Sequence, residues 1–281
     1  MGLRVNTNVA SLNAQRHLYN TTSRFGKSME RLSSGLRINR SGDDAAGLAI
    51  SESLKSDIRA LQQASRNAAD GISLVQTAEG SLDEVNNILL RLRELAEQAA
   101  TETLGEDERV YMNNEFQELL DEINRISNTA EFNGIKLLDG TAQTLRVQVG
   151  IGTDATTSAV SINLTQGMSA DDLALTAGSV NITGTNGDAA RVAIGLITTA
   201  TGRVSSMRAN FGAAQNRFET SIRNIGMTAE NLAAANSRIR DVDVALETSN
   251  MTSLQILQQA GVAILAQANS TSQLALNLLQ G

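Results

Sequence analysis

The side chains that could carry out chemistry are few in this sequence, and their spacing argues against an enzyme. The chain has no Cys, which excludes thiol catalysis, Cys-ligated zinc and disulfides. His17 is its only His, whereas a zinc protease needs two His residues around a Glu on one helix. Gly150 and Gly152 form only half of a phosphate-binding loop, and no helix signature follows them. We therefore expect no catalytic residue, no metal site and no cofactor.

Charge is distributed unevenly along the 281 residues, whose net charge is −7. Residues 1–42 contain seven Lys or Arg and one acid, Glu30, while residues 250–281 contain no charged side chain. A basic segment can bind nucleic acid or an anionic membrane. These seven charges, however, are scattered and have no aromatic side chains between them for stacking on bases. We favour a solvated helix face, with no nucleic-acid partner.

Neither a secretion signal nor a membrane span is expected from the apolar residues. The first residues, MGLRVNTNVASLNAQ, contain no unbroken apolar stretch and no small-residue cleavage site. No window of eighteen residues is apolar throughout, because Gln and Asn interrupt even the uncharged C-terminal segment. We expect no insertion into a membrane.

The elements that must position these side chains are long helices with aliphatic cores. The chain has no Pro, the strongest helix breaker, and aromatic residues make up only 2% of it. Two series of apolar or small residues recur at every seventh position, which predicts two supercoiled helices of over fifty residues each. The first series is Leu54, Leu61, Ala68, Val75, Leu82, Leu89 and Ala96, and the second is Ile197, Val204, Phe211, Phe218, Ile225, Leu232, Ile239 and Leu246. A shorter series is Met112, Phe116, Leu119, Ile123 and Ile126.

Weaker apolar stripes mark a helix at each end of the chain. The C-terminal one has no ionic face, and such a helix needs packed partners for most of its stability. Its stripe is also wider than one neighbouring helix would cover. We therefore expect the terminal stripes to be buried against other copies of the same chain. The residues expected to drive polymerisation in this way are Val5, Val9, Leu12, Leu254, Leu257, Ile264 and Leu278.

The middle of the chain changes from helical to strand periodicity. Apolar residues alternate with polar ones around residues 145–149 and 160–164, and Asn133-Gly134 is a strong turn signal. The predicted fold is mainly α: an elongated, out-and-back helical bundle or coiled coil with a small β-hairpin region at its tip. Its expected divisions are a terminal helix and connector (1–42), half of a helical core (43–140), a β-rich tip (141–190), the other half of the core (191–249) and a second terminal helix (250–281).

Several long motifs make the chain resemble the bacterial flagellins. Residues 30–52, ERLSSGLRINRSGDDAAGLAISE, are similar to the N-terminal signature of that family. Residues 71–80 (GISLVQTAEG) and 131–138 (EFNGIKLL) resemble further parts of the N-terminal half, and 231–243 (NLAAANSRIRDVD) resemble the C-terminal signature. The resemblance covers roughly residues 1–140 and 190–281 and leaves too short a tip for a large outer domain.

The resemblance implies a structural subunit that polymerises into the helical filament used for swimming. The terminal helices would form the inner tube, and the partners would be many copies of the chain, the flagellar junction and cap proteins, and an export chaperone at the C-terminus. The place of action would be the secreted, extracellular filament. A hook–filament junction protein, which shares flagellin-like termini, is the alternative.

Two further sites follow from the resemblance alone. Residues 90–98, LRLRELAEQ, resemble the site bound by the vertebrate Toll-like flagellin receptor, with receptor-binding positions at Arg91, Arg93, Leu95, Gln98 and Glu115. The alternative is that these are ordinary surface charges around a core leucine. Hydroxyl side chains of the tip are candidates for O-glycosylation or, alternatively, part of a solvated loop: Thr153, Thr156, Thr157, Ser158 and Ser161.

Overall fold

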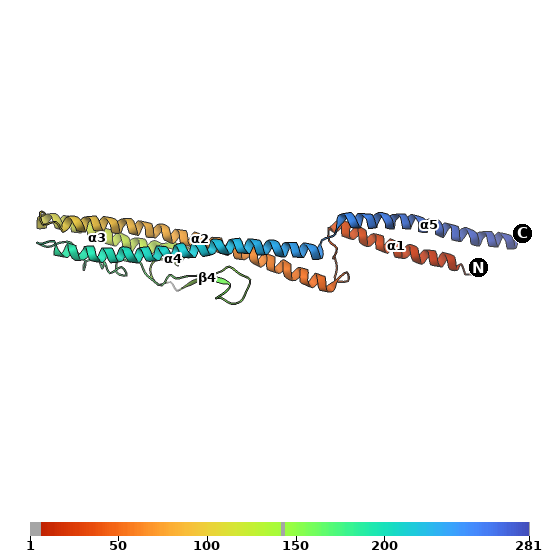
Figure 1. Ribbon diagram of the computed structural model, residues 1–281, viewed down its shortest axis with the longest axis horizontal. Coiled ribbons are helices and arrows are strands. Elements are labelled where there is room, and N and C mark those ends of the chain that lie inside the picture. Colours follow the sequence, from red (N-terminus) through yellow and green to blue (C-terminus); the bar gives the residue numbers. More distant parts are fainter. Residues whose placement is uncertain (1–6, 142–143, 281) are drawn as a thin grey trace. The chain divides into compact units, whose positions relative to one another are not determined.

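The computed structural model describes residues 7–141 and 144–280, with side chains up to residue 271. Its described elements confirm a mainly α fold with a small β region (Figure 1). The helices are α1 (Val9–Ser34), α2 (Ala45–Ala99), α3 (Glu106–Thr129), α4 (Asp188–Arg240) and α5 (Val244–Gln280). The strands are β1 (Glu131–Phe132), β2 (Ile135–Lys136), β3 (Leu145–Gln148) and β4 (Ala159–Ile162).

The chain divides into two compact units. The terminal unit comprises Met1–Ser56 and Asn231–Gly281 and contains the α1–α5 pair. The central unit comprises Asp57–Glu230 and contains α3, both hairpins and most of α2 and α4. Figure 1 shows α1 and α5 side by side in the first unit, and α2, α3 and α4 side by side in the second.

The seven-residue series form the core of the central unit. From Ala68 to Ala96, every member of the α2 series is at most 2% exposed, as are Ile197, Val204, Phe211 and Phe218 on α4. The last member of the α4 series is an error of the sequence interpretation, because α4 ends at Arg240 and Leu246 lies on α5 with 63% of its surface exposed. The helix ends there because residues 241–242 leave it to pair with residues 35–37: Arg37 N–H donates to Arg240 O at 2.7 Å, and Val242 N–H to Gly35 O at 3.0 Å.

Close contact between α2 and α4 depends on the missing side chain of Gly71. A Cβ atom built at Gly71 would lie 2.7 Å from Cζ of Phe218, well inside van der Waals contact. We expect Gly71→Ala to destabilise the central unit by about 1–3 kcal/mol through overpacking. Gly80→Ala is the matched control on the same helix, because no atom lies within 4 Å of its added Cβ. It should stabilise the helix by about 0.5–1 kcal/mol. Urea unfolding followed by circular dichroism measures both, and equal effects would contradict the packing argument.

Both predicted β features are present. Strands β1 and β2 are antiparallel, and the turn between them places Asn133 and Gly134 at φ 50° and 79°, the left-handed conformation that this residue pair tolerates. Strands β3 and β4 pair antiparallel with Val147 opposite Val160. The Asn67 side chain donates to Gln148 O at 3.1 Å and so holds the end of β3 on α2.

Candidate assembly surface

Helices α1 and α5 pack antiparallel along a seam that mixes small, polar and some large apolar residues. The two ends of the pair are marked by the hydrogen bond from Asn8 Nδ2 to Ala268 O, 2.9 Å, and by the ion pair between Arg31 and Glu247. The least exposed positions alternate at spacings of three and four, as in a coiled coil. They are Ser11, Ala14, Leu18, Thr21, Phe25 and Ser28 on α1, and Glu247, Met251, Leu254, Gln258, Gly261, Leu265 and Ala268 on α5.

Large apolar side chains remain on the outside of this pair. Val9, Leu12, Leu257 and Ile264, which the sequence assigned to polymerisation, are 56–60% exposed. Leu254 is half-buried in the seam between the helices. Of the other two assigned residues, Val5 lies outside the described residues, and so does the side chain of Leu278. Further exposed apolar residues on the two helices are Tyr19, Met29, Leu246, Ile256 and Val262. A helix pair with so much exposed apolar surface is typical of a protein interface.

Loop residues 35–44 join α1 to α2 within the terminal unit. Gly35 ends α1 in the left-handed conformation (φ 72°), and its N–H donates to Arg31 O at 2.9 Å. Asp44 caps α2 by accepting from Gly47 N–H at 2.9 Å. Asp43 instead accepts from the Asn39 and Arg40 N–H groups and from Lys27 Nζ at 2.5 Å. The loop is therefore tied to α1 by an ion pair.

That ion pair predicts a pH dependence of stability. The Lys27 ammonium, together with the two backbone donors, lowers the pKa of Asp43 from 3.8 to about 2. Because the folded-state pKa is lowered, the carboxylate adds stability above pH 4 that is lost as the pH falls through 2. The thermal midpoint of Asp43→Asn should therefore lie below that of the unmodified chain at pH 6, and the gap should close at pH 2. In the presence of Lys27→Met, the difference in thermal midpoint between Asp43→Asn and its parent should also become smaller. A gap that stays constant with pH would contradict the assignment.

The residues matched to the receptor site lie on α2 and α3 of the central unit. Arg91 donates from Nε and Nη2 to Glu115 Oε1 at 3.0 and 2.8 Å, and from Nη1 to Glu94 Oε2 at 3.1 Å. These carboxylates, Glu115 first, raise the pKa of Arg91. Arg93 and Gln98 are also exposed. Leu95 is only 2% exposed, because it is packed into the helical core, which favours the alternative that it is a core leucine.

The hydroxyl groups proposed for glycosylation lie on and after the loop that connects β3 to β4. Thr153, Thr156, Thr157 and Ser161 are exposed. Ser158, by contrast, is 6% exposed and lies against Gly150 and Gly152, so little of its side chain is accessible in this structure. Thr156 is already bound within the loop, since its N–H and hydroxyl both donate to Asp154 Oδ1, and these bonds lower the pKa of Asp154.

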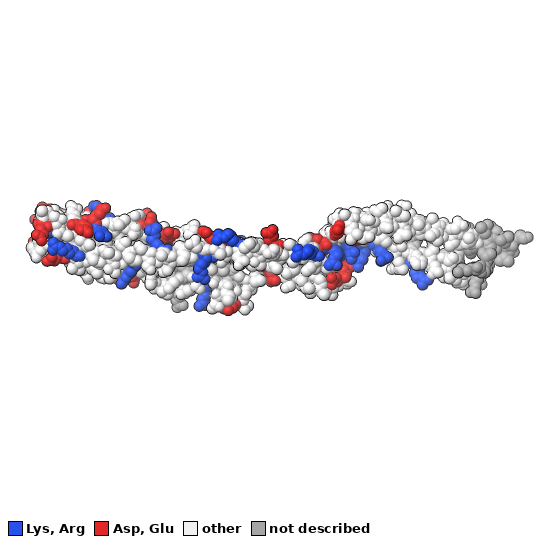
Figure 2. All heavy atoms as spheres, viewed as in Figure 1, with Lys and Arg blue, Asp and Glu red and all other residues white. Residues whose placement is uncertain are grey.

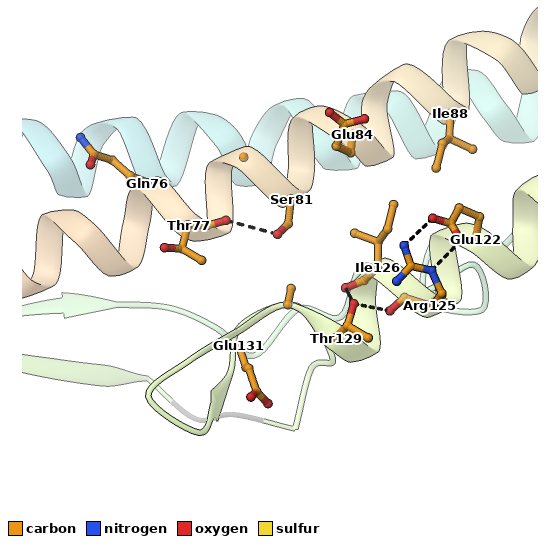
Figure 3. A pocket seen from close by; sticks show the side chains of 12 residues that line it. Gln76, Thr77, Ser81, Glu84, Ile88, Glu122, Arg125, Ile126, Thr129 and Glu131 are labelled. Atoms are coloured by element: carbon orange, nitrogen blue, oxygen red, sulfur yellow. Dashed lines mark hydrogen bonds and ion pairs between the residues drawn. The ribbon is translucent and has the colours of Figure 1, made fainter.

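A groove of about 810 Å³ lies between α2, α3 and β1 (Figure 3). Its hydroxyl groups point back to their own helices: Thr77 donates to Ser73 O at 2.9 Å and Ser81 to Thr77 O at 3.2 Å. Arg125 and Glu122 form a bidentate pair at 2.6 and 2.7 Å, which raises the pKa of Arg125 and lowers that of Glu122. The hydroxyl groups and the Arg125–Glu122 pair of the groove are thus already bonded within the chain, and its lining residues show no arrangement of nucleophile and base.

Two further kinds of site, a metal centre and a membrane-spanning helix, are absent from the described part of the chain. No group of three or more His, Cys, Asp or Glu residues is placed there to hold a metal ion. No helix within the same residues is long and apolar enough to cross a bilayer.

Comparison with known proteins gives matches along nearly the whole chain. Family models for the bacterial flagellin N-terminal and C-terminal helical regions match residues 5–143 and 194–279. A flagellin of Halalkalibacterium halodurans is 48% identical over 277 residues, covering 98% of this chain and 99% of the relative. A flagellin of Bacillus subtilis is 44% identical over 307 residues, covering 99% and 100%.

A solved structure, that of a putative flagellar hook-associated protein from Vibrio parahaemolyticus, has a similar fold. Its TM-score is 0.53 at 15% sequence identity, over 69% of this chain and 100% of that one. At this identity the likeness concerns the fold alone.

Proposed function

The chain belongs to the bacterial flagellin family, and we propose that its α1–α5 pair is the surface through which the subunits join. As a member of this family of structural proteins it is a subunit of the bacterial flagellar filament, in a short form without a large outer domain. The hook–filament junction alternative has no comparable support, since two relatives that match along nearly the whole chain at 44–48% identity are flagellins.

The observation that carries this assignment is the exposed apolar surface of the two terminal helices. Burial of aliphatic surface yields about 25 cal/mol per Å², so covering these residues with neighbouring copies stabilises a lattice. An open helical filament requires head-to-tail contacts between two different surfaces of the chain. We assign residues 1–42 and 250–281 to the inner tube, 43–140 and 191–249 to the helical core around it, and 141–190 to an outward-facing tip.

Electron microscopy of the purified chain, concentrated from monomers, tests this function. Long hollow helical filaments are the expected result. Soluble oligomers or short caps would instead support a junction protein or a scaffold that does not polymerise by itself.

The remaining assignments concern partners and location. We propose contacts with the flagellar junction and cap proteins, and an export chaperone that covers the C-terminal helix before assembly. The filament is extracellular, and we propose that the subunit reaches it unfolded through the flagellum's own export channel. We assign no catalytic activity and no cofactor. Thr153, Thr156, Thr157 and Ser161 remain proposed glycosylation sites.

Recognition by the vertebrate Toll-like flagellin receptor is a second proposed role, favoured by the exposed pair of Arg91 with Glu115. Arg91→Ala should weaken binding of the monomer to the receptor ectodomain by about tenfold or more, because truncating an interface Arg commonly costs about 2 kcal/mol. Arg125→Ala, which breaks another exposed ion pair on α3, is the control and should leave binding unchanged. Equal binding by both variants would exclude this surface.

A further inference from the structure

The α1–α5 pair has two flanks of different chemistry. The residues on one side of the seam of α1 include the large uncharged side chains of Leu12, Tyr19 and Met29. The residues on the other side include Arg24, Lys27 and Arg31, whose spacings of three and four place them on one face. Figure 2 shows blue side chains along α1 and a largely white surface over α5. The two flanks therefore cannot take the same partner surface.

A groove of about 340 Å³ follows the basic flank. The wall formed by α1 contains three cations, Arg24, Lys27 and Arg31, beside Ser28. The wall formed by α5 contains one acid, Glu247, together with Asn250, Ser253, Leu254 and Leu257. We call it the basic groove. It offers N–H and O–H donors next to an exposed leucine, which suits a helix that carries both carboxylates and aliphatic side chains.

The cations of the basic groove are not fully matched within the terminal unit. Arg31 Nη1 lies 3.7 Å from Glu247 Oε2, beyond hydrogen-bond distance, and Arg31 Nε is buried without an acceptor. Arg24 has no acidic partner within the described residues. A buried guanidinium donor without an acceptor is costly, so a further acceptor in this groove would be favourable.

We propose that the basic groove binds carboxylates from the central unit of a second copy of the chain. The inference rests on the proposed function, because it requires a lattice of identical subunits. Charge complementarity supports it: residues 1–56 with 231–281 contain 10 bases and 7 acids, whereas residues 57–230 contain 13 bases and 23 acids. Helix α3 alone has seven acids, and of its two bases Arg109 is buried.

The α1–α5 pair of a second copy fits the basic groove less well than the central unit does. The only acids of these helices are Glu30 and Glu247, and each already pairs with an Arg of its own chain, Arg40 and Arg31. Packing two such pairs groove to groove would bring like charges together and leave them without counter-charges. The exposed aliphatic residues of the opposite flank fit that role better, so the two flanks would contact different parts of the neighbouring subunits.

Site-specific cross-linking can identify the occupant, because the chain has no Cys of its own. Ser253→Cys places a label in the groove, and Gln259→Cys places one on the opposite flank of α5. Each variant is labelled with a benzophenone maleimide, copolymerised with excess unmodified chain and irradiated. The Ser253 label should yield cross-linked peptides from residues 57–230, with α3 well represented, and the Gln259 label peptides from α1 and α5. If the Ser253 label yields cross-linked peptides only from residues 1–56 or 231–281, the proposal is overturned.

The critical concentration of polymerisation gives an independent measurement. Arg24→Gln should raise it about tenfold in 50 mM NaCl, the equivalent of one lost charge-assisted hydrogen bond, and should weaken its salt dependence. Arg16→Gln is the matched control on α1, because Arg16 does not line the groove. If the unmodified chain forms filaments but Arg24→Gln and Arg16→Gln have the same critical concentration, this inference is overturned and the proposed function stays intact. Failure of the unmodified chain to polymerise would count against the proposed function itself.

Discussion

Replacing Arg109 with Ala should lower the free energy of unfolding of the central unit by about 3–5 kcal/mol, more than the replacement of any exposed residue. Arg109 is 1% exposed and has no carboxylate partner. Its guanidinium instead donates to three carbonyl oxygens: Ala99 O at 3.0 Å, Thr101 O at 3.0 Å and Gly184 O at 2.6 Å. Ala99 is the last residue of α2, so the positive charge also lies where the helix dipole is negative. Without the guanidinium, these carbonyls would be left without their donors.

The matched control is Arg125→Ala on the same helix. The ion pair of Arg125 with Glu122 is exposed, so its loss should change the free energy of unfolding by less than about 1 kcal/mol. Urea unfolding of the full chain, followed by circular dichroism at 222 nm, would measure both variants. Arg109→Lys should recover only part of the stability, because one ammonium group cannot reproduce the fork of three donors. A loss similar to that of Arg125→Ala would mean that the Arg109 bonds contribute little.

The double change Leu257→Ser and Ile264→Ser should prevent polymerisation at concentrations at which the unmodified chain forms filaments. Both residues are more than half exposed in the single chain. Most of the stabilisation that their burial can give is therefore gained only when neighbouring subunits cover them. Losing that burial should cost about 2–3 kcal/mol, which raises the critical concentration about 30- to 160-fold. Neither residue is in the seam of the α1–α5 pair, so the monomer should keep its helix content.

The control for this prediction is Val192→Ser, which removes an equally exposed aliphatic side chain from α4. Sedimentation of polymer across a concentration series gives the critical concentration, and circular dichroism reports the fold of each monomer. Val192→Ser should behave like the unmodified chain. Normal filaments from the double variant would exclude the outer face of α5 as an assembly surface.

Much of the fold could be predicted from the sequence because its periodicities are long. The series of α2 and α4 repeat every seventh residue, and a helix places such residues on one face whatever its partner. The same reasoning applies to the β3–β4 hairpin, where alternation fixes which side chains face the core. Leu246 shows the limit of this argument. It continues the α4 pattern although the helix has ended, because a backbone pairing between distant segments decided the end.

Arg109 shows what a pattern can conceal. It lies seven residues before Phe116 and fourteen before Ile123, both buried, so a charged residue occupied a position of the apolar stripe. That conflict between residue type and position was a usable signal. Its resolution required the carbonyls of residues 99, 101 and 184, which come together only in the folded unit. The burial of Leu95 and Ser158 was hidden for the same reason, since exposure depends on neighbours far along the chain.

By itself the sequence determined the helical class, the presence of two helices of over fifty residues, the uncharged character of residues 250–281 and the family. These follow from composition, period and local motifs, which act over a few turns of chain. Only the tertiary structure decided which face of each terminal helix enters the seam. Small residues such as Ala14 and Gly261 allow the close approach of α1 and α5, and only part of the large apolar side chains, Leu18 and Leu254 among them, enters the seam. Others, such as Leu257 and Ile264, stay outside it. Part of each apolar stripe read from the sequence thus lies on the surface of the single chain, where it can bind neighbouring copies.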